Sequence, residues 1–364
     1  MAKVAVGLSG GIDSGTTALM LIERGYEVIG VTMWLFDHQS GELEAAKKVA
    51  DALGIQHHIL DYRSAFHERV VHTFVKHYEQ GFTPNPCLLC NKHFKYGRLI
   101  EDCVALGADY FATGHYVRCD VSSETGEYQI KRAINQRKDQ SYNLYHLDQQ
   151  TLSRLIFPLG HAPSKDHVRA RFSSLNVELA QKKDSLGICF IPHKDHRNFL
   201  TTLGSTAMEP GNFLDLSGQI LGHHNGTAAF TIGQKRRLGI DLNGQYLNGK
   251  YLVVGINPHT NEVMLGAEDD LAHYEIKCND FNIVSPLLLK SLLNSSISQI
   301  NIGVEVDVIV SQWSQVYRGV LNYNQAARTA VVTFESPVRA PAKGQALVCY
   351  HEEVLIGGGI IVGY

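Results

Sequence analysis

The 364-residue sequence lacks the features that mark several large classes of protein. It has no apolar run near the ~20 residues that a membrane-spanning helix needs, and the run at its start is too short for a signal peptide. Its seven cysteines follow no regular spacing, which argues against a secreted disulfide framework. We therefore expect a cytoplasmic protein with no membrane partner, whose cysteines are reduced and serve chemistry or core packing.

The sequence also lacks a strong excess of charge. The 33 Lys and Arg nearly balance the 36 Asp and Glu, for a net charge of −3, which excludes a protein that is basic throughout but allows a local basic surface. The chain has no internal repeat, and its 44% hydrophobic and 19% charged residues are typical of soluble globular proteins. At roughly 150 residues per domain, we expect two or three domains.

Residues 1–197 are predicted to form an α/β domain. Apolar runs typical of buried strands occupy residues 3–8, 28–34, 56–60 and 110–113, and helical patterns occupy residues 14–24, 42–53, 64–80 and 91–106. This alternation predicts βαβ units and a doubly wound parallel sheet with helices on both faces. Ligands of such sheets bind at the carboxyl ends of the strands.

The pattern changes near residue 200. Residues 198–270 hold short runs broken by glycine and are predicted to form a small β-rich central domain. Residues 271–364 return to strand patterns with few helices between them, which predicts a C-terminal antiparallel β-barrel. The expected barrel strands are 304–310, 318–323, 329–334, 346–350 and 360–362.

The strongest local motif joins the first expected strand to the first expected helix. It reads Gly7-Leu8-Ser9-Gly10-Gly11-Ile12-Asp13-Ser14. Its glycines let backbone N–H groups approach an anion, and the following helix points its positive end at the same place. A helix cap alone would explain an Asp or a Ser here, but two serines, two glycines and an aspartate exceed what capping needs. The motif is neither Gly-x-Gly-x-x-Gly nor a Walker A loop, which disfavours dinucleotide binding and γ-phosphate transfer.

This loop resembles the pyrophosphate-binding (PP) loop of ATP pyrophosphatases. Members of that superfamily cleave ATP between its α- and β-phosphates and leave AMP on a substrate oxygen. The resemblance implies ATP and Mg²⁺ as cofactors, with Asp13 as a candidate magnesium ligand and an adenine nucleotide α-hydrolase type of fold.

Two cysteines lie in distinctive surroundings. Cys90 follows the proline-rich stretch Thr83-Pro84-Asn85-Pro86-Cys87, near the expected start of a helix. Because a helix N-terminus lowers the pKa of a thiol, Cys90 is a candidate nucleophile. Cys189 stands in a second distinctive stretch, residues 184–191.

Several motifs in the same order narrow the resemblance to the tRNA-specific 2-thiouridylase (MnmA) family. They are the proline loop with its cysteine, Gly114-His115-Tyr116, Lys138-Asp139-Gln140-Ser141-Tyr142, the stretch 184–191 and Gly233-Gln234-Lys235-Arg236. The match runs from Lys3 to Ile360, essentially the whole chain. It implies that ATP adenylates the C2 oxygen of the wobble uridine of tRNA, and that Cys189 carries the persulfide sulfur that replaces this oxygen. Cys90 would then either liberate sulfide from the persulfide or close a disulfide with Cys189.

The same resemblance assigns the binding residues and partners. Met33 and Gly114 would contact the nucleotide, and the uridine pocket would be lined by Asn85, Pro86, Cys87, Lys138, Asp139 and Gln140. The partners would be the anticodon stem-loop of tRNA, contacted in part by the central domain, and a sulfur-relay protein or cysteine desulfurase. Basic residues concentrated between 131 and 237 favour tRNA binding, and Trp313 is a candidate for base stacking. We expect a monomer or a weak dimer.

Cys87 departs from the common pattern of the family, in which many members have aspartate. With Cys90 and Cys189 it offers three thiolates, the set with which some related thiolation enzymes hold a [4Fe–4S] cluster. Plain persulfide chemistry is the favoured interpretation, and the cluster remains an alternative. A second alternative is a PP-loop ligase that adenylates a small carbonyl or carboxyl substrate for attack by an amine. A third is an RNA-binding or iron–sulfur module without activity.

Overall fold

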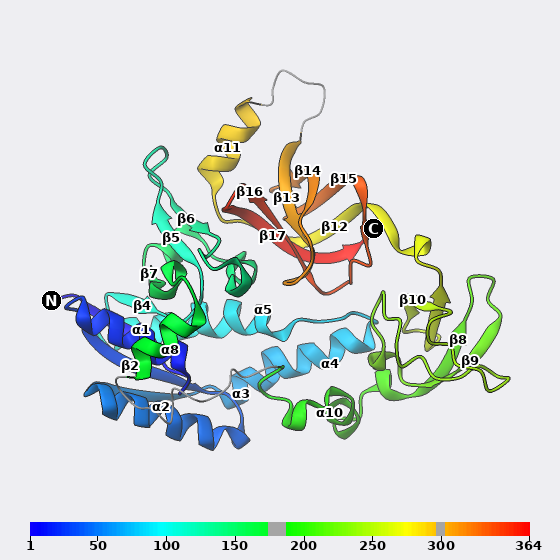
Figure 1. Ribbon diagram of the computed structural model, residues 1–364, viewed down its shortest axis with the longest axis horizontal. Helices are drawn as coiled ribbons and strands as arrows, with labels where there is room; N and C mark the ends of the chain where they lie inside the picture. The colour runs from blue at the N-terminus through cyan, green and yellow to red at the C-terminus, as the bar shows by residue number, and fades with distance from the viewer. Residues whose placement is uncertain (174–186, 296–302) are drawn as a thin grey trace.

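The computed structural model describes residues 1–173, 187–295 and 303–364. Its chain forms a parallel sheet with helices, a small central sheet and a C-terminal barrel (Figure 1). Of the stretch 184–191, residues 184–186 lie outside the described residues, as do Lys182 and Lys183. Among the described helices, none is both long and apolar enough to span a membrane.

The N-terminal sheet is wholly parallel, as the alternating pattern predicts. Its strands are β1 (Lys3–Gly7), β2 (Glu27–Trp34), β3 (Gln56–Asp61), β4 (Tyr110–Ala112) and β7 (Leu155–Ile156), in the order β3-β2-β1-β4-β7. The strand order reverses direction at β1, between β2 and β4. The carboxyl ends of β1 and its neighbours therefore flank the crevice where such a sheet binds its ligand.

Helices cover both faces of this sheet. They are α1 (Ile12–Glu23), α2 (Ser40–Leu53), α3 (Arg63–Phe66), α4 (His72–Glu79), α5 (Pro86–Cys90), α6 (Leu99–Ala105), α7 (Gln149–Leu152) and α8 (Lys165–Ser173). Val4 and Val6 of β1 pack in one core with α1, α2 and α8, whereas Ala5 between them packs in another core with α3 and α6. This alternation within one strand is the pattern expected when both faces of a sheet are buried. The predicted doubly wound fold is confirmed.

The central region holds an open four-stranded sheet. After α10 (His196–Thr202), its strands β8 (Pro210–Leu214), β9 (Ile220–Asn225), β10 (Leu252–Asn257) and β11 (Glu262–Gly266) take the order β10-β11-β8-β9. Phe213 and Phe230 lie at the centre of its small separate core.

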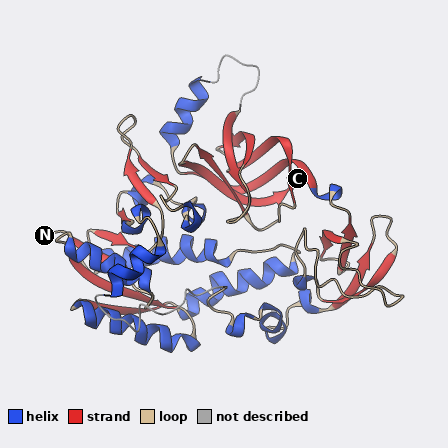
Figure 2. Ribbon diagram, in the orientation of Figure 1, coloured by secondary structure: helices blue, strands red, loops and turns tan. Residues whose placement is uncertain are grey.

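The C-terminal strands close into an antiparallel barrel, as predicted. They are β12 (Ala272–Ile283), β13 (Val304–Ile309), β14 (Tyr317–Asn324), β15 (Thr329–Arg339), β16 (Ala346–His351) and β17 (Val354–Gly363), with α11 (Pro286–Ser295) after β12. They pair in the order β12-β15-β14-β13-β16-β17, and β17 returns to β12. Figure 2 shows the barrel strands beside the helices of the N-terminal region.

The barrel shares structure with the N-terminal region. A hairpin of β5 (Arg118–Val121) and β6 (Tyr128–Lys131) extends the barrel sheet, because Lys131 pairs with Val354 of β17. Tyr350 of β16 lies in the same core cluster as residues of β1 and α6. Its hydroxyl group lies 3.0 Å from the Ser141 hydroxyl group. The two parts are therefore packed as one body.

Candidate active site

The predicted pyrophosphate loop lies between β1 and α1, where the sheet reverses its strand order. Within it the Ser9 N–H group donates a hydrogen bond to Ser14 Oγ over 3.2 Å, and Ser14 Oγ donates to the Gly11 carbonyl oxygen over 3.1 Å. Gly10 has a φ of +69°, and a Cβ atom there would lie 2.6 Å from Ala45 Cβ in α2. Glycine is therefore required at position 10 for both conformation and space.

Asp13 begins the first turn of α1 and is held by two other elements. Its carboxylate accepts hydrogen bonds from the Tyr116 hydroxyl group, over 2.8 Å, and from Lys165 Nζ of α8, over 2.6 and 2.7 Å. The backbone after β4 approaches from the other side: a Cβ atom on Gly114 would lie 2.9 Å from the Asp13 carbonyl carbon. Gly114 is thus the residue that allows the two loops to touch.

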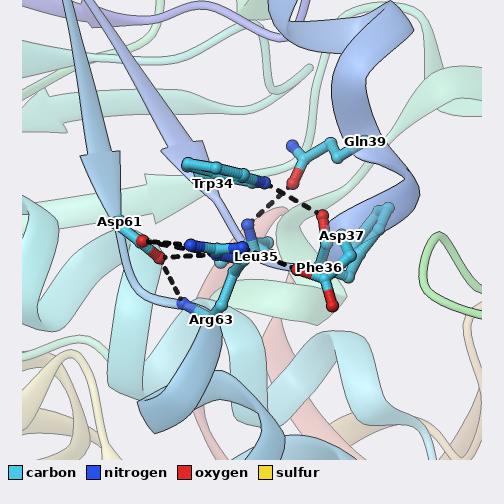
Figure 3. Close-up of polar contacts among 7 residues, drawn as sticks. All are labelled: Trp34, Leu35, Phe36, Asp37, Gln39, Asp61 and Arg63. Atoms are coloured by element: carbon cyan, nitrogen blue, oxygen red, sulfur yellow. Dashed lines mark hydrogen bonds and ion pairs between the residues drawn. The ribbon is translucent and has the colours of Figure 1, made fainter.

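A network of polar contacts braces the loop after β2 (Figure 3). The Gln39 side chain accepts from Leu35 N–H over 2.7 Å and donates to the Met33 carbonyl oxygen over 2.9 Å. Arg63, at the start of α3, pairs with Asp61 and Asp37 and lies 3.6 Å from the centroid of the Trp34 ring. The sequence analysis missed this network, although Asp61 and Trp34 both end strands at the ligand-binding edge of the sheet.

One cavity of about 1010 Å³ connects the loop to the cysteines. The predicted site residues that line it are Leu8, Ser9, Gly11, Ile12, Asp13, Met33, Pro86, Cys87, Cys90, Gly114, Lys138, Gln140 and Cys189. Gly7 and Ser14 line a smaller cavity of about 260 Å³ that shares part of this wall. Residues far apart along the chain, among them Ser9, Asp13 and Cys189, therefore line one space.

Three predicted site residues lie outside the lining of both cavities: Gly10, Asn85 and Asp139. Asn85 caps α5, since its side chain accepts from the Cys87 N–H group over 3.1 Å. The half-buried Asp139 carboxylate accepts from Ala133 N–H, Ser141 N–H and the Ser141 hydroxyl group. Burial raises the pKa of Asp139, and these hydrogen bonds oppose that rise. Asp139 thus holds the loop whose neighbours Lys138 and Gln140 face the cavity.

The predicted position of Cys90 at a helix start is wrong. Helix α5 begins earlier, at Pro86, because Asn85 supplies the cap and proline suits the first helical position. Cys87 therefore occupies the first turn, and Cys90 is the last residue of α5. The expected lowering of the Cys90 pKa by the helix end is also wrong: burial raises that pKa to about 11.

The other two thiols follow the same trend. Cys87 and Cys189 are exposed residues that line the cavity, and the protein around each thiol partly removes it from water. This desolvation raises the pKa of Cys87 and raises that of Cys189 to about 12. The positive charge of Lys95 lowers the pKa of all three thiols against this effect. None of the three forms a disulfide in this structure.

The barrel also reaches the cavity. Gln312 and Trp313, which follow β13, line it beside residues of the N-terminal region. Trp313 is 74% exposed, so its ring is open to a large ligand. Among the predicted basic residues, Lys138 lines the cavity, Lys165 pairs with Asp13 and Lys235 pairs with Glu268. Arg236 and Arg237 are exposed on the central region.

Family comparisons agree with this geometry over the three regions of the chain. The tRNA methyl transferase HUP domain family matches residues 2–193, the tRNA methyl transferase PRC-barrel domain family matches 197–267, and the aminomethyltransferase beta-barrel domain family matches 296–361. A tRNA-specific 2-thiouridylase MnmA from Carboxydothermus hydrogenoformans is 38% identical over 99% of this chain and 97% of its own. One from Desulforudis audaxviator is 39% identical, over 99% and 98%. The chain belongs to the MnmA family.

Solved structures resemble this MnmA-family chain only distantly. The U34-tRNA thiolase NcsA from Methanococcus maripaludis, solved with its [4Fe–4S] cluster, is 19% identical. The match covers 56% of this chain and 65% of that one, with a TM-score of 0.35. A similarity this low carries no argument about the site of the MnmA-family protein.

Proposed function

We propose that this protein is an ATP-dependent tRNA 2-thiouridylase that replaces the C2 oxygen of the wobble uridine by sulfur. The observation that carries the proposal is the single cavity shared by the pyrophosphate loop and three cysteine thiols. Sulfur can replace a carbonyl oxygen only after that oxygen has become a good leaving group. A nucleotide site and a sulfur-bearing side chain must therefore share one space, so that water does not react first.

The loop end of the cavity suits activation of the uridine. Backbone N–H groups near Gly11 and the N-terminus of α1 favour a bound phosphate chain. The C2 oxygen of uridine attacks the α-phosphorus of ATP, the bond to the β-phosphate breaks, and pyrophosphate leaves. The uridine is then joined to AMP through its C2 oxygen.

The cysteine end of the cavity supplies the sulfur. In one route the terminal sulfur of the Cys189 persulfide attacks C2, the C2–O bond breaks, and AMP leaves with the electron pair. Cys90 then attacks Cys189 Sγ and closes a disulfide, which leaves the transferred sulfur on C2 as 2-thiouridine. A thiol reductant must supply two electrons to reopen that disulfide. In the other route Cys90 first attacks Cys189 Sγ, closing the same disulfide, and the sulfide released attacks C2.

The residues of the cavity suit Mg²⁺ better than a [4Fe–4S] cluster. Asp13 and the Ser9 hydroxyl group offer the oxygen ligands that Mg²⁺ prefers, on the wall of the nucleotide cavity. A bound Mg²⁺ would neutralise phosphate charge there. Cys87, Cys90 and Cys189 are the donor type for a [4Fe–4S] cluster, but the part of the chain that the structure describes brings no three His, Cys, Asp or Glu groups together for a metal. We therefore derive no step through a cluster.

The substrate would approach through the cavity mouth. Lys138 and Lys194 on its lining can contact tRNA phosphates, and the exposed Trp313 ring can stack on an anticodon base. Arg236 and Arg237, exposed on the central region, can contact further tRNA phosphates. A sulfur-relay protein or cysteine desulfurase would load Cys189. We also propose domain boundaries after residues 197 and 270. The protein is proposed to act in the cytoplasm as a monomer or a weak dimer.

The alternative function is that of an amide-forming ligase of the same superfamily. Such a reaction uses an amine as nucleophile and does not need the cysteines of the cavity. The two functions are separated by incubating the protein with unmodified tRNA, ATP, Mg²⁺ and a persulfide donor, and by resolving thiolated tRNA on a mercury-containing gel. We expect 2-thiouridine at the wobble position, with AMP and pyrophosphate in equal amounts.

The matched variants of this experiment are Cys189→Ala and Cys119→Ala. Cys119 is partly buried in β5 and does not line the cavity. We expect the first variant to lose product and the second to keep it. If Cys189→Ala forms 2-thiouridine at the wild-type rate, Cys189 does not carry the persulfide. If wild-type protein forms no 2-thiouridine, the proposed function is wrong. The visible spectrum of anaerobically purified protein separately decides whether a cluster is present.

A further inference from the structure

Lys95 lies on an irregular turn between the two helices that follow the proline loop. Residues Asn91–Arg98 form a π-helical turn that joins α5 to α6. Gly97 leaves helical geometry there, with φ −104° and ψ −107°, and a Cβ atom on it would lie 2.9 Å from the Lys92 carbonyl oxygen. The turn thus depends on glycine. Single π-turns inside helices occur often at functional sites, because they change where the neighbouring side chains point.

The Lys95 side chain lines both cavities of the site. The larger cavity holds the three thiols, and the smaller one lies against Gly7, Ser14 and His115. The described residues common to both walls are Leu8, Ser9, Asp13, Met33, Lys95, Gly114 and Gln140. Lys95 is the only cation in this shared wall. It therefore stands at the junction of the nucleotide end and the sulfur end.

Two neighbouring cations, Lys92 and Lys165, form ion pairs, whereas Lys95 forms none with the described part of the chain. Lys165 pairs with Asp13, and Lys92, on the same turn, pairs with Asp280 of the barrel. Within residues 1–173, 187–295 and 303–364, Lys95 makes no hydrogen bond or ion pair. Its charge nevertheless acts on the surrounding groups, since it lowers the pKa of the Cys90 thiol and of the half-buried His115. A lysine without an anionic partner, in a cavity that handles anions, is ready to receive one.

We propose that Lys95 is a catalytic residue whose ammonium group contacts the phosphate oxygen that links uridine C2 to AMP. This inference rests on the function proposed above. When sulfur attacks C2, the C2–O bond breaks and its electron pair moves onto that phosphate oxygen. A fixed cation at the junction stabilises the negative charge as it forms, which lowers the barrier more than it strengthens ATP binding.

The test compares Lys95→Met, which keeps the length of the side chain, with Lys95→Arg, which keeps the charge. Lys92→Met is the control on the same turn, with its charge directed to the barrel. For each variant we would measure the ATP dissociation constant, the thermal midpoint and the single-turnover rate of 2-thiouridine formation.

We expect Lys95→Met to slow the single turnover about 10²–10³-fold, the range seen when one transition-state donor is removed. Its ATP affinity and thermal midpoint should stay close to wild type, Lys95→Arg should recover part of the rate, and Lys92→Met should match wild type. A purely structural role predicts instead a lower thermal midpoint and weaker ATP binding along with the rate.

Besides that structural outcome, two results overturn the inference while leaving the proposed function intact. One is a Lys95→Met rate within threefold of an active wild type, and the other is a rate loss that Lys95→Arg does not relieve at all. If wild-type protein makes no 2-thiouridine, the proposed function and this inference fall together. The three outcomes are distinguishable in one set of assays.

Discussion

The two ends of the cavity are built in different ways. At the nucleotide end, Ser9 and Ser14 are hydrogen-bonded within their loop, Asp13 is held by Tyr116 and Lys165, and Gly10 has no room for a side chain. At the sulfur end, Cys87, Cys90 and Cys189 are thiols without a disulfide, in a space that desolvates them and that Lys95 also lines.

This difference matches the two chemical tasks. ATP is the same molecule in every turnover, so a site that is fixed in advance binds and orients it at the least entropic cost. The sulfur end passes through several covalent states in each cycle, from persulfide to disulfide to thiol. It therefore needs side chains that are not already committed to other partners.

The largest expected effect comes from a substitution at the sulfur end that leaves the nucleotide end unchanged. Cys90→Ala should reduce multiple-turnover formation of 2-thiouridine roughly 10³-fold, the scale of losing a reacting group. ATP affinity should be unchanged, because the loop residues do not depend on this thiol. Measurement of both quantities on one preparation checks the prediction, and a parallel loss of ATP binding would contradict the division between the ends.

The second-largest expected effect comes from a substitution at the nucleotide end. Gly10→Val should weaken ATP binding about 10- to 100-fold, since the residue combines a φ of +69° with contact to Ala45. Gly41→Ala is the matched control, because a Cβ atom on Gly41 meets nothing within 4 Å. Calorimetry with a non-hydrolysable ATP analogue measures the affinity of both variants. If Gly10→Val binds the analogue as tightly as Gly41→Ala does, the loop adapts to a side chain at position 10 and is not rigid.

A smaller effect tests whether the brace after β2 belongs to the fixed end. Arg63→Ala removes the pairs with Asp37 and Asp61 and the contact with the Trp34 ring. Exposed ion pairs contribute little, so we expect ATP affinity to fall only about two- to fivefold. Lys48→Ala, which breaks the exposed pair with Glu44, should leave affinity unchanged.

Local patterns predicted much of the site, and long-range packing decided the rest. The loop at residues 7–14 is visible in sequence because glycine spacing and a strand-to-helix transition are local. The helical pattern predicts a helix from residue 91, whereas α5 begins at Pro86, where Asn85 and Pro86 carry a recognisable cap signal. The role of Lys95 had no such signal, because it depends on a π-turn and on two cavities formed by distant segments.

In the barrel, too, local patterns predict the strands but not how distant strands pair. Its strands are evident from alternating residues, but their closure through β12 and β17 and the addition of β6 depend on pairings between remote positions. Likewise, the family resemblance assigns Asp139 to the uridine pocket together with Lys138 and Gln140. In the structure its carboxylate accepts hydrogen bonds from the backbone N–H groups of Ala133 and Ser141, a role that the motif alone does not indicate.

The hairpin of β5 and β6 has a consequence for how this chain can be divided. Glu127, beside β6, accepts from the N–H groups of Leu287 and Leu288 at the start of α11, and Arg118 pairs with Glu353. A truncated chain ending before the barrel would leave the β6 edge unpaired and the ring of Tyr142 uncovered, since its hydroxyl group donates to the Ala346 carbonyl oxygen. The nucleotide-binding part is thus not a detachable module, and shortened versions of this protein are expected to aggregate.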